Sequence, residues 1–409
     1  MNYIEPKTHL AELFRQAVAQ VAPDSAVAIE LDRPKQASHG DYACNAAMQL
    51  ARALKKNPRE VASQIMAALP ASDRVEKVEI AGPGFINVFL KPIAKQCLVG
   101  HVLAEGANYG RSNAGKGVKV QIEFVSANPT GPMHVGHGRG AAYGASLANC
   151  MAFAGFQVYR EYYVNDAGRQ MDILALSTWL RYLELNGEFV AFPGNAYQGD
   201  YVKMMAEGIY ALHGDRYKRA AADVSAGVPE AADAPDDHLD ALIANAKRLL
   251  GPDYDYIHGY ALEEQLGDGR NDLTEFGVVF DHWFSERTLH DAGLIDRAVA
   301  ALQKNGHIYE QDGALWFRST AFGDEKDRVV KRENGIYTYF AADIAYHLNK
   351  FERGFDRVID IWGADHHGYI PRVKGAIEGL GLEPERLTVA LVQFAVLYRD
   401  GKKASMSTR

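Results

Sequence analysis

The sequence predicts an α/β protein whose main domain is built on a parallel β-sheet. Residues 118–124 alternate apolar and polar side chains with the period of a strand. A loop with two prolines and a glycine follows, and then an Ala- and Gly-rich segment typical of a helix packed closely on a sheet. Residues 158–163 show a second strand with its own loop and helix start, and residues 357–362, RVIDIW, form an apolar run of the kind that parallel sheets bury. This alternation predicts a wound, Rossmann-like sheet.

The length and composition of the chain limit the kinds of protein it can be. Its 409 residues are too many for one ordinary domain, and 47% hydrophobic with 23% charged residues is the composition of a globular protein. No run approaches the roughly 20 apolar residues of a membrane span, and the first residues lack a signal-peptide pattern. Cys44, Cys97 and Cys150 are too widely spaced to indicate a zinc site or a disulfide framework. We therefore expect a cytoplasmic protein with no membrane contact and no metal ion held by its own side chains.

Residues 1–110 are expected to form a small α+β domain. An apolar pattern around Leu10 predicts a first helix, and residues 41–54 carry apolar side chains at helical intervals, which predicts a second. The sequence Asn-Pro-Arg-Glu at 57–60 is a strong helix start, with a capping residue before a first-turn proline. Residues 75–90 alternate around a Gly-Pro-Gly turn and predict two strands.

A glycine-rich linker, residues 104–119, leads into the α/β domain. Within that domain residues 187–275 interrupt the alternation with predicted helices near 199–212 and 236–250, and we interpret them as an inserted helical subdomain. Acidic residues concentrate there, most simply as a solvated face. The net charge of −8 does not indicate a nucleic-acid-binding protein, but a local RNA-binding face elsewhere remains open.

The strand pattern resumes near Phe280. Residues 314–318 and 327–332 are predicted to be short strands, and residues 334–335 a hairpin turn. A helix is predicted at 341–350 and a buried strand at 389–397.

The tetrapeptide His134-Val135-Gly136-His137 lies at the start of the Ala- and Gly-rich helix. A helix N-terminus attracts phosphate through its free N–H groups and its dipole. Gly136 would let a nucleotide approach the backbone, and His134 and His137 can donate to oxygens that gain charge when a phosphorus centre is attacked. Because the motif is short, a helix start with two surface histidines is the alternative.

The longer block EFVSANPTGPMHVGHGRGA, which contains this tetrapeptide and follows a strand, closely resembles the signature of class I aminoacyl-tRNA synthetases. Within that class it resembles the arginyl-tRNA synthetases of the bacterial type, and the similarity extends over essentially the whole chain. The resemblance implies two steps, in which L-arginine and ATP form arginyl-adenylate and the arginyl group is then attached to tRNA(Arg). Mg²⁺ would enter with ATP, and a monomer is expected.

The resemblance also implies a domain organisation. Residues 1–110 would be the N-terminal domain that contacts the D-loop of the tRNA, and residues 111–409 the class I catalytic domain with the insertion at 187–275. Family members continue past a loop of pattern KMSKS into a helical domain that reads the anticodon, whereas this sequence ends inside that loop. We therefore expect a fragment from which the anticodon-binding domain is absent.

Three motifs carry the ATP site that the resemblance implies. His134 and His137 would be catalytic, and Asp365 in the sequence GADHH would accept from the ribose hydroxyls, although Asp365 could instead cap a helix. Ser405 and Thr408 stand where the KMSKS loop has its two lysines, so cationic help from this loop is in doubt. The full implied set for ATP is His134, Gly136, His137, Gly363, Asp365, Ser405, Met406, Ser407 and Thr408.

Recognition of arginine requires carboxylates, because a planar guanidinium is best bound by a matched pair of oxygens. By the resemblance, Glu286 and Asp343 would bind the guanidinium and Tyr339 would bound the pocket. The alternative for the two acids is a pair of surface salt bridges. The full implied set for arginine is Glu123 and Asn128 at the amino-acid end, Glu286, Tyr339, Asp343, and His366, which stands where the family often has glutamine.

The segment GFINVFL resembles the edge through which the family's N-terminal domain contacts tRNA. Phe85 would stack on a base and Asn87 would form hydrogen bonds, which is a sound way to bind unpaired nucleotides. The alternative is that Phe85 is a core residue.

Three other functions compete with this interpretation. A sister class I synthetase such as the cysteinyl enzyme would need a Cys/His zinc set that the sequence lacks. A small-molecule nucleotidyltransferase also uses H-x-G-H but needs neither an N-terminal domain nor paired acids. A non-catalytic RNA-binding protein could keep the fold, but His134, His137, Glu286 and Asp343 argue against it.

Overall fold

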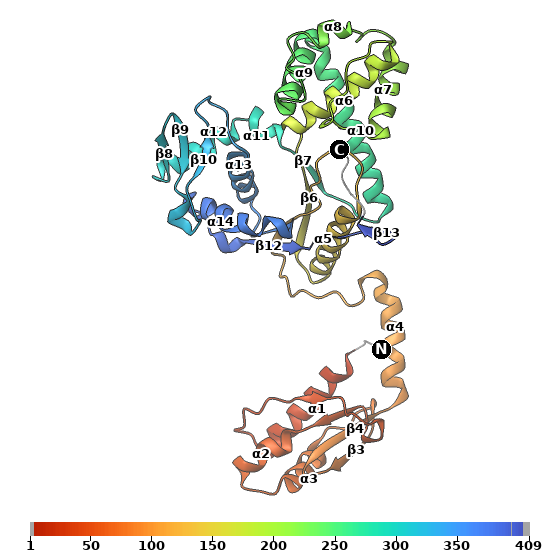
Figure 1. Cartoon of the computed structure of the whole chain (residues 1–409). Coiled ribbons are helices and arrows are strands. Elements are labelled where there is room, and N and C mark those ends of the chain that lie inside the picture. The colour runs from red at the N-terminus through yellow and green to blue at the C-terminus, as the bar shows by residue number, and fades with distance from the viewer. Residues whose placement is uncertain (1–3, 394, 404–409) are drawn as a thin grey trace. The chain divides into compact units, whose positions relative to one another are not determined.

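The computed structural model describes residues 4–393 and 395–403, and the chain divides into two compact units, Met1–Gly110 and Arg111–Arg409 (Figure 1). Each unit has a hydrophobic core of its own. Among the described residues, none of the helices combines the length and apolar character that a bilayer span requires.

In the first unit three helices cover one face of a four-stranded antiparallel sheet (Figure 1). The strand order is β1-β2-β4-β3, so β4 lies inside the sheet. Apolar side chains such as Phe14, Leu50 and Ile65 from the helices pack against Ile86 and Val88 from β4. The elements are α1 (Pro6–Val21), β1 (Leu31–Asp32), β2 (Tyr42–Cys44), α2 (Ala46–Leu54), α3 (Pro58–Ala68), β3 (Val75–Ala81), β4 (Phe85–Leu90) and α4 (Pro92–Glu105).

The predicted helix at 41–54 is wrong in its first part, because residues 42–44 form strand β2. Tyr42 and Cys44 pair with β4, a partner distant in sequence, and this pairing overrides the helical spacing of the local pattern. The predicted helix start at Asn57 is confirmed, since its side-chain oxygen accepts a hydrogen bond from the Arg59 N–H at 2.9 Å.

The second unit is built on a five-stranded sheet in the order β12-β11-β5-β6-β7, and every neighbouring pair is parallel. The chain starts in the middle with β5, moves outward through β6 and β7, and then crosses to the other side of β5 for β11 and β12. The predicted Rossmann-like parallel sheet is thus confirmed. The strands are β5 (Lys119–Glu123), β6 (Gln157–Val164), β7 (His282–Ser285), β11 (Arg357–Gly363) and β12 (Leu387–Val392).

Helix α5 (Val135–Phe153) packs closely on the sheet, as its small residues predict. Ala141, Gly144 and Ala148 are buried at helical spacing. A Cβ atom on Gly144 would lie 2.3 Å from the Phe124 ring, so only glycine fits there. This contact sets the distance between the end of β5 and the N-terminus of α5.

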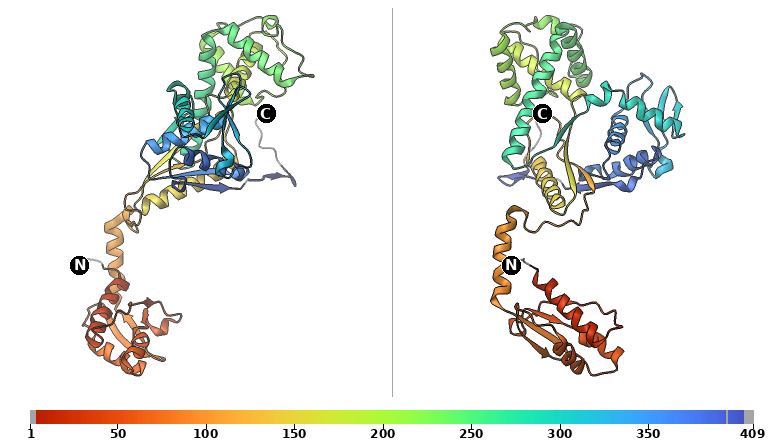
Figure 2. Two further views of the ribbon diagram at one scale, coloured as in Figure 1. Left: turned by 90° about the vertical axis from the view of Figure 1, so that its left-hand side faces the viewer. Right: turned by 180° about the vertical axis from the view of Figure 1, so that it is seen from behind.

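The segment after β6 forms a helical bundle with a core of its own. Its helices stay grouped in both views of Figure 2. Two of them lie where the sequence predicts helices. The bundle contains α6 (Arg169–Leu185), α7 (Asp200–His213), α8 (Ala221–Val224), α9 (Pro235–Leu250) and α10 (Asp253–Glu275).

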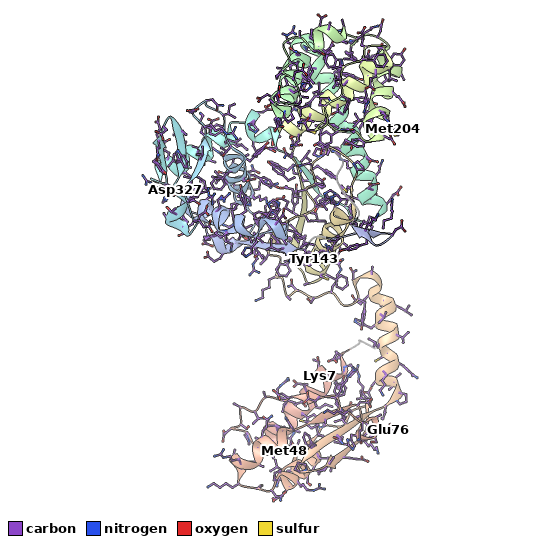
Figure 3. All side chains as sticks on the ribbon, viewed as in Figure 1. Lys7, Met48, Glu76, Tyr143, Met204 and Asp327 are labelled. Atoms are coloured by element: carbon purple, nitrogen blue, oxygen red, sulfur yellow. The ribbon has the colours of Figure 1, made fainter. Side chains whose placement is uncertain are left out.

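The strands predicted near 314 and 327 do not continue the main sheet but form a separate antiparallel sheet in the order β10-β9-β8. Asp312 and Gly313 join β8 to β9 with φ of 51° and 73°, a tight turn that imposes antiparallel pairing. Asp327, labelled in Figure 3, accepts from the Tyr309 hydroxyl at 3.0 Å before β10. The remaining elements are α11 (Arg287–Asp291), α12 (Leu294–Lys304), β8 (Ile308–Gln311), β9 (Ala314–Phe317), β10 (Arg328–Lys331), α13 (Tyr339–Glu352), η4 (Ala364–Tyr369) and α14 (Ile370–Gly379).

Replacing Asn57 with alanine removes the cap of α3 and should lower the free energy of unfolding of the first unit by about 1 kcal/mol. Urea denaturation followed by circular dichroism measures it. Asn45→Ala is a matched control, because Asn45 precedes α2 without a side-chain cap bond. Equal losses in the two variants would contradict the capping role of Asn57.

Candidate active site

A cavity of about 450 Å³ opens at the carboxyl ends of β5 and β11. These strands flank the point where the chain reverses its direction across the sheet, which is where wound α/β sheets bind ligands. The lining residues are Glu123, Val125, Ser126, Asn128, Tyr163, Asn165, Tyr339, Asp343, Tyr346, His347, Ile361, Trp362, Gly363, His366 and Tyr369.

Three carboxylates, one of which lines this cavity, lie in one row across the sheet. Asp360 on β11 is paired in register with Glu123 on β5, which is paired in register with Glu161 on β6. All three are buried. Since the interior of a parallel sheet is ordinarily apolar and a buried charge requires a partner, the row depends on cations supplied from elsewhere.

Helix α13 supplies those cations. Lys350, fully buried, donates from Nζ to Glu123 Oε2 at 2.5 Å and to Asp360 Oδ1 at 2.7 Å. Arg353 binds Glu161 with two nitrogens, at 2.5 and 2.8 Å. Burial alone would raise the pKa of Asp360, but Lys350 and His347 outweigh it and hold that pKa well below its usual range. Asp360 therefore stays ionised inside the protein.

His347 links this network to the cavity. Its Nδ1 lies 2.7 Å from the backbone oxygen of Asp343 and its Nε2 lies 2.9 Å from Asp360 Oδ2. A carbonyl and an ionised carboxylate both accept, so only the doubly protonated ring satisfies both contacts. The contact through the Asp343 backbone fixes the turn of α13 that presents the Asp343 side chain to the cavity.

Two further acids, Glu286 and Asp343, have no cationic partner of this kind. Neither forms an ion pair with a lysine or arginine of residues 4–393 or 395–403. Asp343 accepts from the Tyr369 hydroxyl, and Glu286 accepts from Tyr163. Burial is the main cause that raises the pKa of Glu286 to about 7, with Asp343 adding to it, and burial also raises the pKa of Asp343. A nearby pair of uncompensated acids is a site for a cationic ligand.

Glu286 itself does not line the cavity but contacts Tyr163, which does. Its backbone N–H donates to Val164 O at 3.0 Å, so β6 fixes the start of α11. The structure thus brings five of the predicted arginine-binding residues around one cavity: Glu123, Asn128, Tyr339, Asp343 and His366. Glu286 lies behind the cavity wall, in contact with Tyr163.

The turn after β5 is strained and also positions the site. Val125 and Ser126 have φ of 69° and 42°, and the Ser126 N–H donates to Phe124 O at 3.0 Å. A β-branched residue rarely adopts such a φ, and strain of this kind gathers at functional sites. The Ser126 hydroxyl donates to Glu123 Oε1 at 2.9 Å and accepts from the Tyr163 N–H at 3.1 Å. The Ser126 hydroxyl therefore fixes Glu123 Oε1, the carboxylate oxygen that Lys350 does not contact.

The two histidines of the tetrapeptide cap helix α5. His134 Nδ1 accepts from the N–H groups of Gly136 and His137, at 3.1 and 3.4 Å, and His137 Nδ1 accepts from the His134 N–H at 3.3 Å. The rings stack with centroids 3.7 Å apart. Since each Nδ1 accepts, a neutral ring carries its proton on Nε2, which is left as a donor. Burial, followed by the nearby His134, lowers the pKa of His137 to about 4, so His137 is neutral near pH 7.

The glycine at position 136 is also favoured by the local packing of the helix cap. A Cβ atom there would lie 2.9 Å from His134 Cε1, so a side chain would displace the capping ring. The cap of α5 therefore requires glycine whether or not a nucleotide approaches this backbone.

The motif GADHH forms the end of β11 and the helical turn η4. Asp365 does not act as the N-cap of this turn, because Gly363 occupies that position. Its side chain is half exposed, 3.6 Å from His366 Nε2. A Cβ atom on Gly363 would lie 2.5 Å from Asp365 Oδ1, so glycine leaves room for the carboxylate beside the strand end. Ser405, Met406, Ser407 and Thr408 lie outside the described residues.

The expected tRNA contacts lie in the first unit. Their segment forms strand β4, which lies between β2 and β3 inside the sheet. Phe85 is 38% exposed, whereas Asn87 is only 5% exposed. Asn87 lies between Ala43 and Glu79 in register, so its neighbours cover it.

Sequence reasoning missed Ser126, Tyr163, His347, Lys350 and Asp360. The signal for one of them was present, since Asp360 interrupts an apolar strand. On α13, Asp343, His347 and Lys350 follow one another at intervals of four and three, which places them on one face of a helix. Within the described residues no group of three or more His, Cys, Asp and Glu side chains is arranged to hold a metal ion.

Comparison with known proteins identifies the family. Residues 8–90 match the family described as Arginyl tRNA synthetase N terminal domain, and residues 98–186 and 285–409 match tRNA synthetases class I (R), catalytic domain. The chain belongs to the arginyl-tRNA synthetase family. Membership makes it an enzyme, a class I arginine–tRNA ligase.

Relatives of this family are similar over nearly the whole chain. The arginine–tRNA ligase of Azoarcus sp. strain BH72 is 67% identical over 99% of this chain and 71% of its own length, and that of Dechloromonas aromatica strain RCB is 66% identical over 98% and 70%. The structure of Thermus thermophilus arginyl-tRNA synthetase aligns over 95% of this chain and 66% of its own, with a TM-score of 0.52 and 22% identity, a likeness of fold. The chain thus spans about 70% of the length of the curated relatives.

Lys350→Met should lower the free energy of unfolding of the second unit by about 3 to 5 kcal/mol, because two buried carboxylates lose their shared cation. Urea denaturation measures it. Lys247→Met is the control, since Lys247 pairs with Asp172 at 2.9 Å on the surface and its loss should cost at most about 1 kcal/mol. A small effect at Lys350 would contradict the role of the network.

Proposed function

We propose that the cavity at the end of β5 and β11 binds arginine beside ATP, and that the enzyme attaches arginine to tRNA through arginyl-adenylate. The observation that carries this proposal is one juxtaposition. Two acids that form no ion pair with a lysine or arginine of the described residues, Asp343 on the cavity wall and Glu286 behind it, share this site with the loop after β5. That loop leads to the N-terminus of α5, which carries two histidine Nε2 donors.

The guanidinium group would lie at Asp343 and Glu286. A guanidinium offers five donors in one plane, which suits carboxylates already oriented by the hydroxyls of Tyr369 and Tyr163. Tyr339, which is 60% exposed, would bound the pocket, and His366 lines the same cavity. The amino-acid end would lie at Glu123 and Asn128, toward the loop that leads to α5.

ATP would lie at the N-terminus of α5. The Nε2 donors of His134 and His137 would bind phosphate oxygens, which gain charge when the arginine carboxylate attacks the α-phosphorus and pyrophosphate leaves. Asp365, beside Gly363, would accept from the ribose hydroxyls. Mg²⁺ would arrive as part of the substrate. In the second step the terminal ribose hydroxyl of tRNA takes the arginyl group, and Phe85 in the first unit would stack on a base of the same tRNA.

The decisive experiment compares amino acids by calorimetry and thermal shift. Arginine should bind and stabilise the fold, whereas citrulline, which has the same shape but a neutral urea group, should bind at least about 100-fold more weakly because the two acids lose their cation. Equal affinity for arginine and citrulline would overturn the assignment of the acid pair.

Asp343→Asn should weaken arginine binding about tenfold or more and leave ATP binding nearly unchanged, because only the guanidinium loses a charged partner. Calorimetric titrations with each ligand measure it. Citrulline affinity serves as the control, since a neutral ligand should respond little to the lost charge. Equal losses for arginine and ATP would contradict this placement.

Arginine binding should release protons. Free Glu286 has a pKa raised to about 7, and a bound guanidinium lowers that pKa, so the carboxyl must lose its proton on binding. Affinity should therefore fall as pH decreases from about 8 to 5.5. Calorimetry in two buffers of different ionisation enthalpy measures the protons released, and Glu286→Gln should abolish most of the release. A pH-independent affinity would count against Glu286.

A further inference from the structure

Asn165 lines the cavity directly after β6, and one of its polar atoms has no partner in the described part of the chain. Its Nδ2 donates to Asn128 Oδ1 at 3.3 Å. Its Oδ1 is buried and forms no hydrogen bond with any described residue. A buried carbonyl oxygen without a donor costs free energy, so such an atom in a site can accept from a ligand group or a water molecule.

The backbone around Asn165 holds this side chain in place. The Asp166 N–H donates to Val164 O at 3.0 Å, which closes a tight turn centred on Asn165. The Asp166 carboxylate is in turn anchored by the Ser285 hydroxyl at 2.6 Å and by the Arg287 N–H at 3.0 Å. The Asn165 carboxamide is therefore fixed by β6 and β7 together.

Gly168 leaves room for the unpaired oxygen. A Cβ atom there would lie 3.0 Å from Asn165 Oδ1, closer than side chains normally approach. Glycine at the start of α6 thus packs closely against this oxygen, which a Cβ atom would crowd.

The position of Asn165 indicates which donor it receives. Its partner Asn128 belongs to the loop that runs from β5 to the capping residue His134. If phosphate binds at His134, the reacting carboxylate of the amino acid must lie near this loop, and the α-ammonium, one carbon away, lies there too. Glu123 accepts from Lys350 and Ser126, and Asn165 Oδ1, which has no donor among the described residues, is a further acceptor for an N–H of that ammonium.

We propose that Asn165 binds the α-ammonium group of the amino acid, an inference that rests on the proposed function. Asn165 also orients the Asn128 carboxamide, because the bond from Nδ2 occupies Asn128 Oδ1 and leaves the Asn128 NH₂ group to donate to the substrate. The pair would therefore distinguish α-amino acids from other guanidine compounds of similar length.

Three ligands test this assignment by calorimetry on the whole chain. Arginine carries all the groups, agmatine keeps the amine but lacks the carboxylate, and 5-guanidinopentanoate keeps the carboxylate but lacks the amine. Asn165→Ala should weaken arginine and agmatine about tenfold or more, and should weaken 5-guanidinopentanoate, which can contact only the Asn128 NH₂ group, by about threefold or less. Asn165→Asp, which keeps an acceptor and adds charge, should restore arginine binding.

Asn149→Ala is the matched control, because Asn149 Oδ1 accepts from Arg160 at 3.0 Å outside the cavity, and it should change none of the three affinities. Thermal melts confirm that each variant is folded. Equal weakening of all three ligands by Asn165→Ala would overturn the proposal and indicate a structural role or a contact with the guanidinium. Failure of the unmodified chain to bind arginine would instead overturn the proposed function.

Discussion

The second unit depends on the contact between helix α13 and a row of buried carboxylates. Asp360, Glu123 and Glu161 occupy adjacent strands at the same level, and an apolar helix in this position would leave three charges unpaired. Lys350 and Arg353 pair with them, so α13 is held in one rotation and at one height against the sheet. A polar interface of this kind specifies a unique geometry, which an apolar contact would specify less strictly.

The same helix places the ligand-facing acid. Asp343 lies about two turns before Lys350, so the rotation that satisfies the buried row also directs Asp343 into the cavity. On the other side of β5, the strained Val125–Ser126 turn and the His134 cap fix the loop that leads to α5. Rigid parts therefore surround the site on both sides, which suits a reaction that depends on positioning more than on covalent participation of the protein.

Local patterns predict much of the fold. The strand, loop and helix around residues 118–145 could be read from the sequence, because alternation and small residues are local signals. The pairing of Lys350 with Glu123 could not, since the partners are 227 positions apart. Strand β2 could not be recognised from its local pattern because it is defined by its pairing with β1 and β4. Helix α4 was missed because, of its described residues, only Ala94 is buried, so no apolar stripe marks it. Glu286 and Asp343 were predicted as one binding site from the family resemblance, because their spacing in the sequence does not indicate that they lie close together.

The separation of these partners along the chain bears on how the protein is made. Strands β5 and β6 emerge from the ribosome well before α13, and until residues 350 and 353 follow, Glu123 and Glu161 have no cations to neutralise them. The first half of the sheet cannot be buried stably in that interval. We therefore expect closure of this part of the sheet to follow synthesis of α13, in the last third of the chain.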